Sequence, residues 1–239
     1  MSEPRLSFDR VAELYERGRP AYADAAIAWI AERLPFGPGR RVLDLAAGTG
    51  KLTRQLLPLG SEVVAVEPGD EMRRTLRRVL PDVEALAGSA EAIPLPGASV
   101  DVVTVGQAFH WFRPDEALAE LHRVIRPGGG FALLWNTWDE EDPVMHAVDV
   151  AVRTHRPEEA PGWRERYVPA LFGDLEERVF PQRRLMPTEA LLDWVASTSH
   201  VATAEPAERE RLLAEVHEIA GRGPLDVSIP TQVVVADRV

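Results

Sequence analysis

The chain contains no cysteine, and Lys51 is the single lysine among its 239 residues. Without cysteine it can form neither disulfides nor thiolate metal sites, and it has no cysteine nucleophile. The same absence fits a reducing compartment. No stretch approaches the roughly 18 apolar residues of a membrane span, and residues 1–10 lack the basic and apolar regions of a signal peptide. We therefore expect a cytoplasmic protein that has no membrane partner.

Positive charge is scarce as well. Only 27 basic side chains stand against 38 acidic ones, which gives a formal net charge of −11. Nucleic acids are bound by basic stripes that release counterions from phosphates, so this balance argues against nucleic acid as a partner. No set of His, Asp and Glu has metal-ligand spacing, and no metal site is expected. Hydrophobic residues make up 45% of the chain, enough for the core of one enlarged domain.

Short apolar runs alternate with helical patterns through the first 137 residues. The pattern predicts strands at 41–45, 62–66, 83–86, 101–105 and 130–135, and helices at 19–34, 51–57, 71–80 and 114–125. Such alternation indicates an α/β fold with a Rossmann-like, doubly wound, mostly parallel sheet. The later part is helical, with helices predicted at 145–154, 188–197 and 207–220, one strand at 176–184 and an antiparallel closing strand at 229–235.

The most informative stretch is the turn between the first predicted strand and the next helix, which reads Leu-Asp-Leu-Ala-Ala-Gly-Thr-Gly-Lys-Leu-Thr from Leu43. Small residues in such a turn let the backbone approach a ligand, and the helix N-terminus offers free N–H groups. A P-loop would need glycine at Leu45 and a hydroxyl residue at Leu52, so that motif is absent. A dinucleotide fingerprint would need a third small residue at Thr53.

Two carboxylates mark the ends of the first two predicted strands. Asp44 sits where a carboxylate is costly unless it is paired or hydrogen-bonded, so it needs partners. Glu67 stands 19 residues past Gly48, near the ~20-residue offset at which an acid accepts hydrogen bonds from ribose hydroxyls in dinucleotide folds. The alternative for Glu67 is a solvated acid that caps the helix starting near Asp70. Glu67 alone does not decide between nucleotide cofactors.

The turn resembles the first motif of class I S-adenosylmethionine-dependent methyltransferases, with Asp44, Gly48 and Gly50 in place and Ala46 where glycine is commoner. Residues 88–94 are similar to the family's adenine-side segment, although Ser89 stands where aspartate is usual. Residues 101–112 and 121–130 resemble the later motifs, so the resemblance covers about 39–137. A narrower resemblance joins Tyr15, Arg19, Pro20, Tyr22 and residues 108–112 to the subgroup that contains trans-aconitate methyltransferases (methyltransferase type 11-like).

This resemblance implies S-adenosylmethionine as cofactor and methyl transfer to a small-molecule acceptor, which in the trans-aconitate group is a carboxylate. The residues that it implies for cofactor binding are Tyr15, Arg19, Asp44, Ala46, Gly48, Gly50, Glu67, Ser89, Ala90, Glu91 and Gln107. For the substrate it points to His110, Trp111 and Trp138, of which His110 is the candidate catalytic residue.

Several roles stay open at this point. Asp44 either caps the turn by accepting backbone N–H groups or lies near the cofactor's ammonium group, and both can hold together. Tyr15 and Arg19, expected on an N-terminal helix across the cofactor, suit a carboxylate of cofactor or substrate, and equally suit helix packing. His110 acts as a general base or only shapes the pocket. The two tryptophans wall the substrate site or belong to the core.

We divide the single structural domain into an N-terminal helical flap at 1–38, a cofactor-binding core at 39–137, a helical cap with one sheet strand at 138–226 and a closing strand at 227–239. Basic cap residues could attract an acidic substrate: Arg153, His155, Arg156, Arg164 and Arg166. Glutamates among them favour a solvated mixed-charge face instead. The alternative functions are a non-catalytic cofactor- or nucleotide-binding module and a nicotinamide-dependent oxidoreductase. A monomer or a homodimer is expected.

Overall fold

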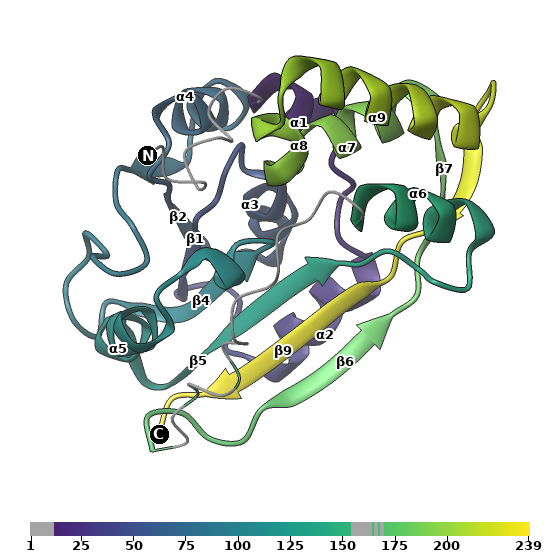
Figure 1. Cartoon of the computed structure of the whole chain (residues 1–239). Helices are drawn as coiled ribbons and strands as arrows, with labels where there is room; N and C mark the ends of the chain where they lie inside the picture. The colour runs from purple at the N-terminus through teal and green to yellow at the C-terminus, as the bar shows by residue number, and fades with distance from the viewer. Residues whose placement is uncertain (1–11, 154–163, 165–166, 168–169) are drawn as a thin grey trace.

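The computed structural model describes residues 12–153, 164, 167 and 170–239, and its centre is one seven-stranded sheet with the order β3-β2-β1-β4-β5-β9-β6 (Figure 1). Its strands are β1 (Arg41–Leu45), β2 (Glu62–Val66), β3 (Glu84–Leu86), β4 (Val100–Gly106), β5 (Ile125–Asn136), β6 (Glu176–Phe180) and β9 (Thr231–Asp237). β1 to β5 pair in parallel, whereas β9 runs antiparallel between β5 and β6. The predicted mostly parallel sheet with an antiparallel closing strand is confirmed.

Helices cover both faces of this sheet, as a doubly wound fold requires. α2 (Asp24–Arg33) and α3 (Lys51–Leu56) pack on the face that carries Val42, Val63 and Val102. α4 (Asp70–Val79) covers the edge of that face near β3. α5 (Pro114–Val124) packs on the opposite face. Because the central strands are buried on both sides, their sequences are continuous apolar runs, and this explains why the apolar runs located them.

A helical cap lies beyond the ends toward which the arrowheads of β5 and β6 point in Figure 1. It contains α6 (Pro143–Arg153), α7 (Thr188–Ala196), α8 (Ser199–Thr203), α9 (Pro206–Ala220) and a two-stranded sheet of β7 (Arg183–Met186) and β8 (Leu225–Ser228). These elements share a core of their own, with Met145, Met186 and Trp194 among its members. α1 (Ala12–Gly18) packs against α7, since a Cβ on Gly18 would collide with the backbone of Trp194.

Three predicted elements need correction. The strand expected at 176–184 is two strands in different sheets, because Pro181 lies between β6 and β7 and cannot donate a ladder hydrogen bond. The helix expected from Arg19 starts only at Asp24. The last described residue of the helix expected at 145–154 is Arg153, and that helix begins at Pro143.

The linker 19–23 between α1 and α2 is held on the sheet by a buried polar network. The Asn136 amide donates to the carbonyls of Pro20 (3.1 Å) and Ala21 (3.3 Å). The Thr231 hydroxyl donates to the side-chain oxygen Oδ1 of Asn136 (2.7 Å) and accepts the Ala23 N–H (2.9 Å). The ends of β5 and β9 thereby fix the position of the residue that begins the linker, Arg19.

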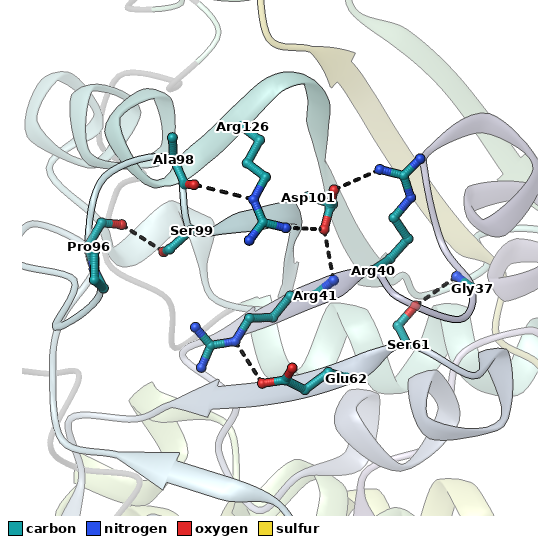
Figure 2. Close-up of polar contacts among 10 residues, drawn as sticks. All are labelled: Gly37, Arg40, Arg41, Ser61, Glu62, Pro96, Ala98, Ser99, Asp101 and Arg126. Atoms are coloured by element: carbon teal, nitrogen blue, oxygen red, sulfur yellow. Dashed lines mark hydrogen bonds and ion pairs between the residues drawn. The ribbon is translucent and has the colours of Figure 1, made fainter.

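At the opposite edge of the sheet, a buried carboxylate joins three segments (Figure 2). Asp101 of β4 accepts hydrogen bonds from the Arg41 N–H (2.8 Å), from Arg40 (3.0 Å) and from Arg126 (2.7 Å). Burial opposes ionisation of this group, but these donors outweigh it and lower the pKa of Asp101. The amino ends of β1 and β4 and the start of β5 are therefore tied together away from the cap.

Within the described part of the chain, no helix is both long and apolar enough to cross a membrane. No three His, Asp or Glu side chains among those same residues are placed to hold a metal ion.

Candidate functional site

A solvent-open cleft of about 730 Å³ lies at the carboxyl ends of β1 to β4. The strand order reverses between β1 and β4, and open α/β sheets bind ligands at such a switch point. The cleft is lined by Tyr15, Arg19, Leu45, Ala46, Gly48, Glu67, Pro68, Met72, Gly88, Ser89, Ala90, Glu91, Gly106, Gln107, Ala108, Trp111 and Phe112. Ten of the predicted cofactor and substrate residues are in this set.

The glycine turn forms one wall of the cleft in a backbone conformation that favours glycine. Gly48 and Gly50 have φ values of 58° and 86°, and Ala46 has φ 56° although it carries a Cβ. Gly50 does not line the cleft. A Cβ there would lie 2.9 Å from Leu80 Cδ1 and 3.1 Å from Leu76 Cγ, so Gly50 lets the turn pack on α4. Ala46 and Gly48 are the turn residues that line the cleft.

Glu67 joins the turn after β1 to the turn after β2 at one wall of the cleft. One carboxylate oxygen accepts the Gly48 N–H and the other accepts the Gly69 N–H, both at 2.8 Å. The side chain is 7% exposed and still reaches the cleft wall. The Glu67 carboxylate therefore lies beside the glycine turn and at the cleft wall.

Asp44 is buried beneath the glycine turn and does not line the cleft. Its carboxylate accepts a hydrogen bond from the Thr53 hydroxyl at 2.5 Å, and the Thr104 hydroxyl lies 3.5 Å away. Burial, opposed by these hydrogen bonds, raises the pKa of Asp44 to about 7. Of the two roles left open, these contacts describe the structural one: Asp44 fixes the start of α3 to β1. The residue that breaks the dinucleotide fingerprint, Thr53, is its partner.

Tyr15 and Arg19 close the cleft on the side of the glycine turn. The Arg19 guanidinium lies over the Tyr15 ring, 5.0 Å from its centroid, and donates to the Ser197 hydroxyl (3.0 Å) and carbonyl (3.2 Å) of the cap. Burial lowers the pKa of Arg19 and raises that of Tyr15. Tyr15 is in α1 as expected, but Arg19 lies just past the end of that helix.

The same short helix is anchored to the core. Glu16 accepts hydrogen bonds from the Thr49 hydroxyl (2.6 Å) and from Arg54 (2.8 Å). Burial opposes ionisation of Glu16, but these two donors outweigh it and lower its pKa. α1 therefore contacts both the glycine turn and the cap.

The far wall is formed by residues 88–91 and 106–112. Glu91 accepts the Arg113 N–H (3.1 Å). Its pKa is lowered because hydrogen bonds, including one from Ser89, outweigh its burial. Gln107 has φ 59° and donates its side-chain amide to the Asn136 carbonyl (3.0 Å), which leaves backbone at the cleft. Trp111 lines this wall.

Two predicted substrate residues lie elsewhere. His110 is exposed in a short 3-10 turn, with its ring 4.9 Å from that of Trp111, and is not part of the cleft wall. Trp138 stacks on Trp194 at 4.7 Å within the cap, and it too is outside the wall. Trp138 thus packs one face on Trp194 and is half-buried in the cap.

Most of the basic cap residues lie outside the residues that the structure describes. Arg164 pairs with Glu177 at 2.9 Å, which fits the mixed-charge alternative at that position. The remaining members of the expected group lie outside the described residues, or have side chains that do: Arg153, His155, Arg156 and Arg166.

Sequence reasoning missed part of the wall. The residues that it did not assign to a ligand are Leu45, Pro68, Met72, Gly88, Gly106, Ala108 and Phe112. Met72 lies in the first turn of α4, shortly after Glu67. Gly106 is required because a Cβ there would collide with the buried Tyr22 hydroxyl. Gly106 ends β4, and Met72 lies in the helix that follows β2, so the position of each near a strand end was the signal.

A family model for methyltransferase domains matches residues 43–133, from β1 into β5. An uncharacterized methyltransferase of Mycobacterium tuberculosis is 42% identical over 221 residues, 92% of this chain and 87% of that protein. This chain belongs to the class I S-adenosylmethionine-dependent methyltransferases. Its cofactor is S-adenosylmethionine and its reaction is methyl transfer. This membership removes the nicotinamide-dependent alternative.

Two further methyltransferases extend the comparison. An uncharacterized methyltransferase-like protein of Schizosaccharomyces pombe is 36% identical over 212 residues, 86% of this chain and 82% of that protein. The solved structure of a proposed type II methyltransferase from Anaeromyxobacter dehalogenans is 31% identical, with a TM-score of 0.66 and coverage of 92% of this chain and 97% of that one. The narrower resemblance to trans-aconitate methyltransferases stays a prediction.

Proposed function

We propose that the cleft binds S-adenosylmethionine with its ribose at Glu67, its adenine toward residues 88–91 and Trp111, and its methionine portion along Ala46, Gly48 and Arg19. The main observation in support of this placement is that the Glu67 carboxylate faces the cleft between the glycine turn and the end of β3. Each of its oxygens accepts one backbone N–H, and a carboxylate oxygen can accept more than one donor. That arrangement supports binding of a ribose diol.

Arg19 gives the opposite end of the cleft a positive charge. Its described hydrogen bonds go to the neutral oxygens of Ser197, and no carboxylate of a described residue pairs with it. A guanidinium that lines a cleft with neutral acceptors suits an incoming carboxylate. We assign it to the cofactor's methionine carboxylate because Gly48, beside Tyr15, lies on this side of the cleft.

Calorimetric titration with S-adenosylhomocysteine tests this placement. Glu67→Gln should weaken binding by about 10- to 100-fold, since hydrogen bonds to a charged group contribute roughly 1.5–3 kcal/mol. Glu62→Gln is the matched control, because Glu62 is an exposed acid at the far end of the same strand. Unchanged affinity in a folded Glu67→Gln variant, or no binding to the folded wild type, would refute the placement.

The acceptor that best fits the cleft is the carboxylate oxygen of a small organic acid. Tyr15, Arg19, Glu67 and Glu91 are the ionisable side chains of its described wall. Burial raises the pKa of Tyr15, and Glu91 is held ionised by its donors. An alcohol or amine needs a base within reach, whereas a carboxylate is already nucleophilic at neutral pH. The walls then act by positioning and by excluding water.

The bound cofactor supplies a sulfonium methyl group. With the cofactor held at Glu67 and Arg19, an acceptor carboxylate oxygen would form the new bond to that carbon while the sulfur–carbon bond would break, so that sulfur would keep the electron pair and no proton would move. The products are a methyl ester and S-adenosylhomocysteine.

Labelled methyl transfer to paired small acids and alcohols distinguishes the acceptors. A methyl ester releases labelled methanol in mild alkali, whereas an ether or methylamine does not. Label that survives alkali would contradict carboxylate methylation, and absence of transfer to any metabolite would favour the binding-module alternative.

His110→Gln should change the rate by less than about twofold, because His110 is not part of the cleft wall. Loss of a catalytic base would lower the rate by roughly 10²–10⁴-fold. A drop of that size would make His110 the base.

A further inference from the structure

Residues 19–23 connect α1 to α2 and belong to neither helix, yet most of this linker is buried, including Pro20, Tyr22 and Ala23. The backbone groups of a buried segment need hydrogen-bond partners, which a helix or a strand normally supplies. For residues 20–22 the described partners are side chains instead. The position of the linker is therefore set by residues that are remote in the sequence.

Two side-chain amides hold the later part of the linker. Gln55 of α3 accepts the Tyr22 N–H and donates to the Tyr22 carbonyl, both at 2.9 Å. Gln182, between β6 and β7, donates to the Ala21 carbonyl (3.2 Å). The Tyr22 side chain fills the space over Gly106, where a Cβ would collide with its hydroxyl. This part of the linker is thus fixed against the end of β4.

Asn136, at the end of β5, holds the part of the linker next to Arg19. Its side-chain amide donates to the carbonyls of both Pro20 (3.1 Å) and Ala21 (3.3 Å). The Thr231 hydroxyl donates to the amide oxygen (2.7 Å) and so fixes which way the amide points. Because Asn136 is buried, its loss would leave these carbonyls without the donors that they need. Asn136 therefore sets the backbone beside the guanidinium that lines the cleft.

Arg19 is held at its other end as well. Its guanidinium lies over the Tyr15 ring and donates to the hydroxyl and the carbonyl of Ser197, just past the end of α7. The residue is thus fixed at the backbone by Asn136 and at the guanidinium by Ser197. A group that is ordered before its ligand arrives loses less conformational entropy on binding.

Asn136 itself does not line the cleft, so it can affect a ligand there only through the residues that it holds. Its backbone carbonyl accepts the Gln107 amide (3.0 Å) from the far wall, and this contact does not use the Asn136 side chain. A substitution of the side chain therefore acts on the linker and on Arg19.

We infer that Asn136 is a positioning residue of the cofactor site, whose side-chain amide fixes the linker so that Arg19 meets the carboxylate of the methionine portion. This role rests on the proposed function, which assigns Arg19 to that carboxylate. The strength of a guanidinium–carboxylate contact depends on the geometry of its donors. A shift of the linker relative to the sheet would therefore weaken this contact, while the contacts to ribose and adenine would remain.

Calorimetry with two probes tests this role. S-adenosylhomocysteine carries the methionine carboxylate, whereas 5′-methylthioadenosine has the same adenosine and sulfur but neither the carboxylate nor the amino group. Asn136→Ala should weaken binding of S-adenosylhomocysteine at least about 10-fold, the equivalent of one charge-assisted hydrogen bond. Binding of 5′-methylthioadenosine should change by less than about threefold. Unchanged affinity for S-adenosylhomocysteine, or equal losses for the two probes, would overturn the role.

A double-mutant cycle tests whether Asn136 acts through Arg19. Arg19→Gln should show the same selective loss of S-adenosylhomocysteine affinity. The double variant Arg19→Gln/Asn136→Ala should bind this probe within about threefold of Arg19→Gln alone, because residues that share one contact are not additive. Losses that add in the double variant would contradict positioning through Arg19.

Two more variants separate positioning from loss of stability. Asp101→Asn is the matched control, because it removes a buried polar anchor at the opposite edge of the sheet. Its melting temperature should fall, but it should bind both probes within about twofold of the wild type. Thr231→Val keeps the side-chain shape and removes the hydroxyl that orients the Asn136 amide. It should lose S-adenosylhomocysteine affinity selectively, by about 3- to 10-fold, and full affinity in this folded variant would count against the role even where Asn136→Ala fails to fold.

The same titrations distinguish failure of this role from failure of the proposed function. No binding of S-adenosylhomocysteine to the wild type, or an Arg19→Gln variant that binds it normally, would refute the cofactor placement itself. A selective loss in Arg19→Gln that is absent from both Asn136→Ala and Thr231→Val would overturn the role of Asn136 and leave the cofactor placement standing.

Discussion

Asp101 should be the most stabilising single carboxylate of the sheet edge opposite the cleft. Its side chain is 5% exposed and joins the Arg41 N–H, Arg40 and Arg126 (Figure 2). Asp101→Asn keeps the shape but removes the charge and replaces one acceptor oxygen by a donor. The amide NH₂ group, a donor, then faces either the Arg41 N–H or an arginine, which are donors too. Arg40 and Arg126 can turn to water, because they are 51% and 42% exposed.

The expected loss follows from these contacts. The buried hydrogen bond to the Arg41 N–H contributes roughly 1.5–3 kcal/mol while its acceptor is charged, and each half-exposed arginine adds about 0–1 kcal/mol. Part of this remains with a neutral amide, so Asp101→Asn should cost about 2–3 kcal/mol. For a chain of this size that lowers the melting temperature by about 4–12 °C. Urea denaturation measures the free energy directly, with the exposed Asp82→Asn as control.

The pH dependence has a defined sign. The folded-state pKa of Asp101 is lowered, so its stabilisation is complete above the pKa of the unfolded chain, about 3.9, and is lost as the pH falls through the folded value. The stability gap between wild type and Asp101→Asn should therefore narrow only below about pH 4. A loss under about 0.5 kcal/mol at neutral pH, or a gap that stays constant in acid, would refute the reasoning. Affinity for S-adenosylhomocysteine should not change, because the cleft is at the opposite edge.

Two further substitutions probe the glycine turn. The pH dependence of stability that Asp44 causes has the opposite sign from that of Asp101. Burial raises the pKa of Asp44 to about 7, so the stability of the wild type should fall as the pH rises from about 4 toward 7. Asp44→Asn should abolish this slope in urea denaturation. A slope that persists in the variant would assign it to another group. Gly50→Ala should cost about 2–4 kcal/mol, from its φ of 86° and from contact with Leu80. Gly39→Ala, with φ 79° and no atom within 4 Å, should lose only about 1–2 kcal/mol in thermal melts, and equal losses would contradict the packing argument.

The sequence predicted the core of the fold well because its strands are buried on both faces. The expected ranges 41–45 and 62–66 are those of β1 and β2. The pair β7 and β8 escaped prediction because both strands are four residues long and pair only with each other. α1 has seven residues and a mostly polar sequence, too short for an apolar period to stand out.

The site was predictable where topology fixes it. Glu67 and residues 89–91 follow strand ends, and strand ends meet at one edge of a parallel sheet. The role of Asp44 was not predictable, because it depends on the contact that Thr53 makes after α3 has packed. The position of the Trp138 ring depends on its stacking against Trp194, which is remote in the chain. No local sequence pattern predicts that contact.

Gly18 gives α1 a position from which it contacts two parts of the protein. With no Cβ at this residue, the helix rests on the backbone of α7, while Glu16, two residues earlier, accepts a hydrogen bond from Thr49 in the glycine turn. Cap and glycine turn therefore share a helix. By thermodynamic reciprocity, a ligand that bound at the glycine turn and stabilised the packing of α1 on the cap would bind more tightly to a protein in which that packing is strengthened. Substitutions in the interface between α1 and α7 should therefore change ligand affinity although they lie outside the cleft.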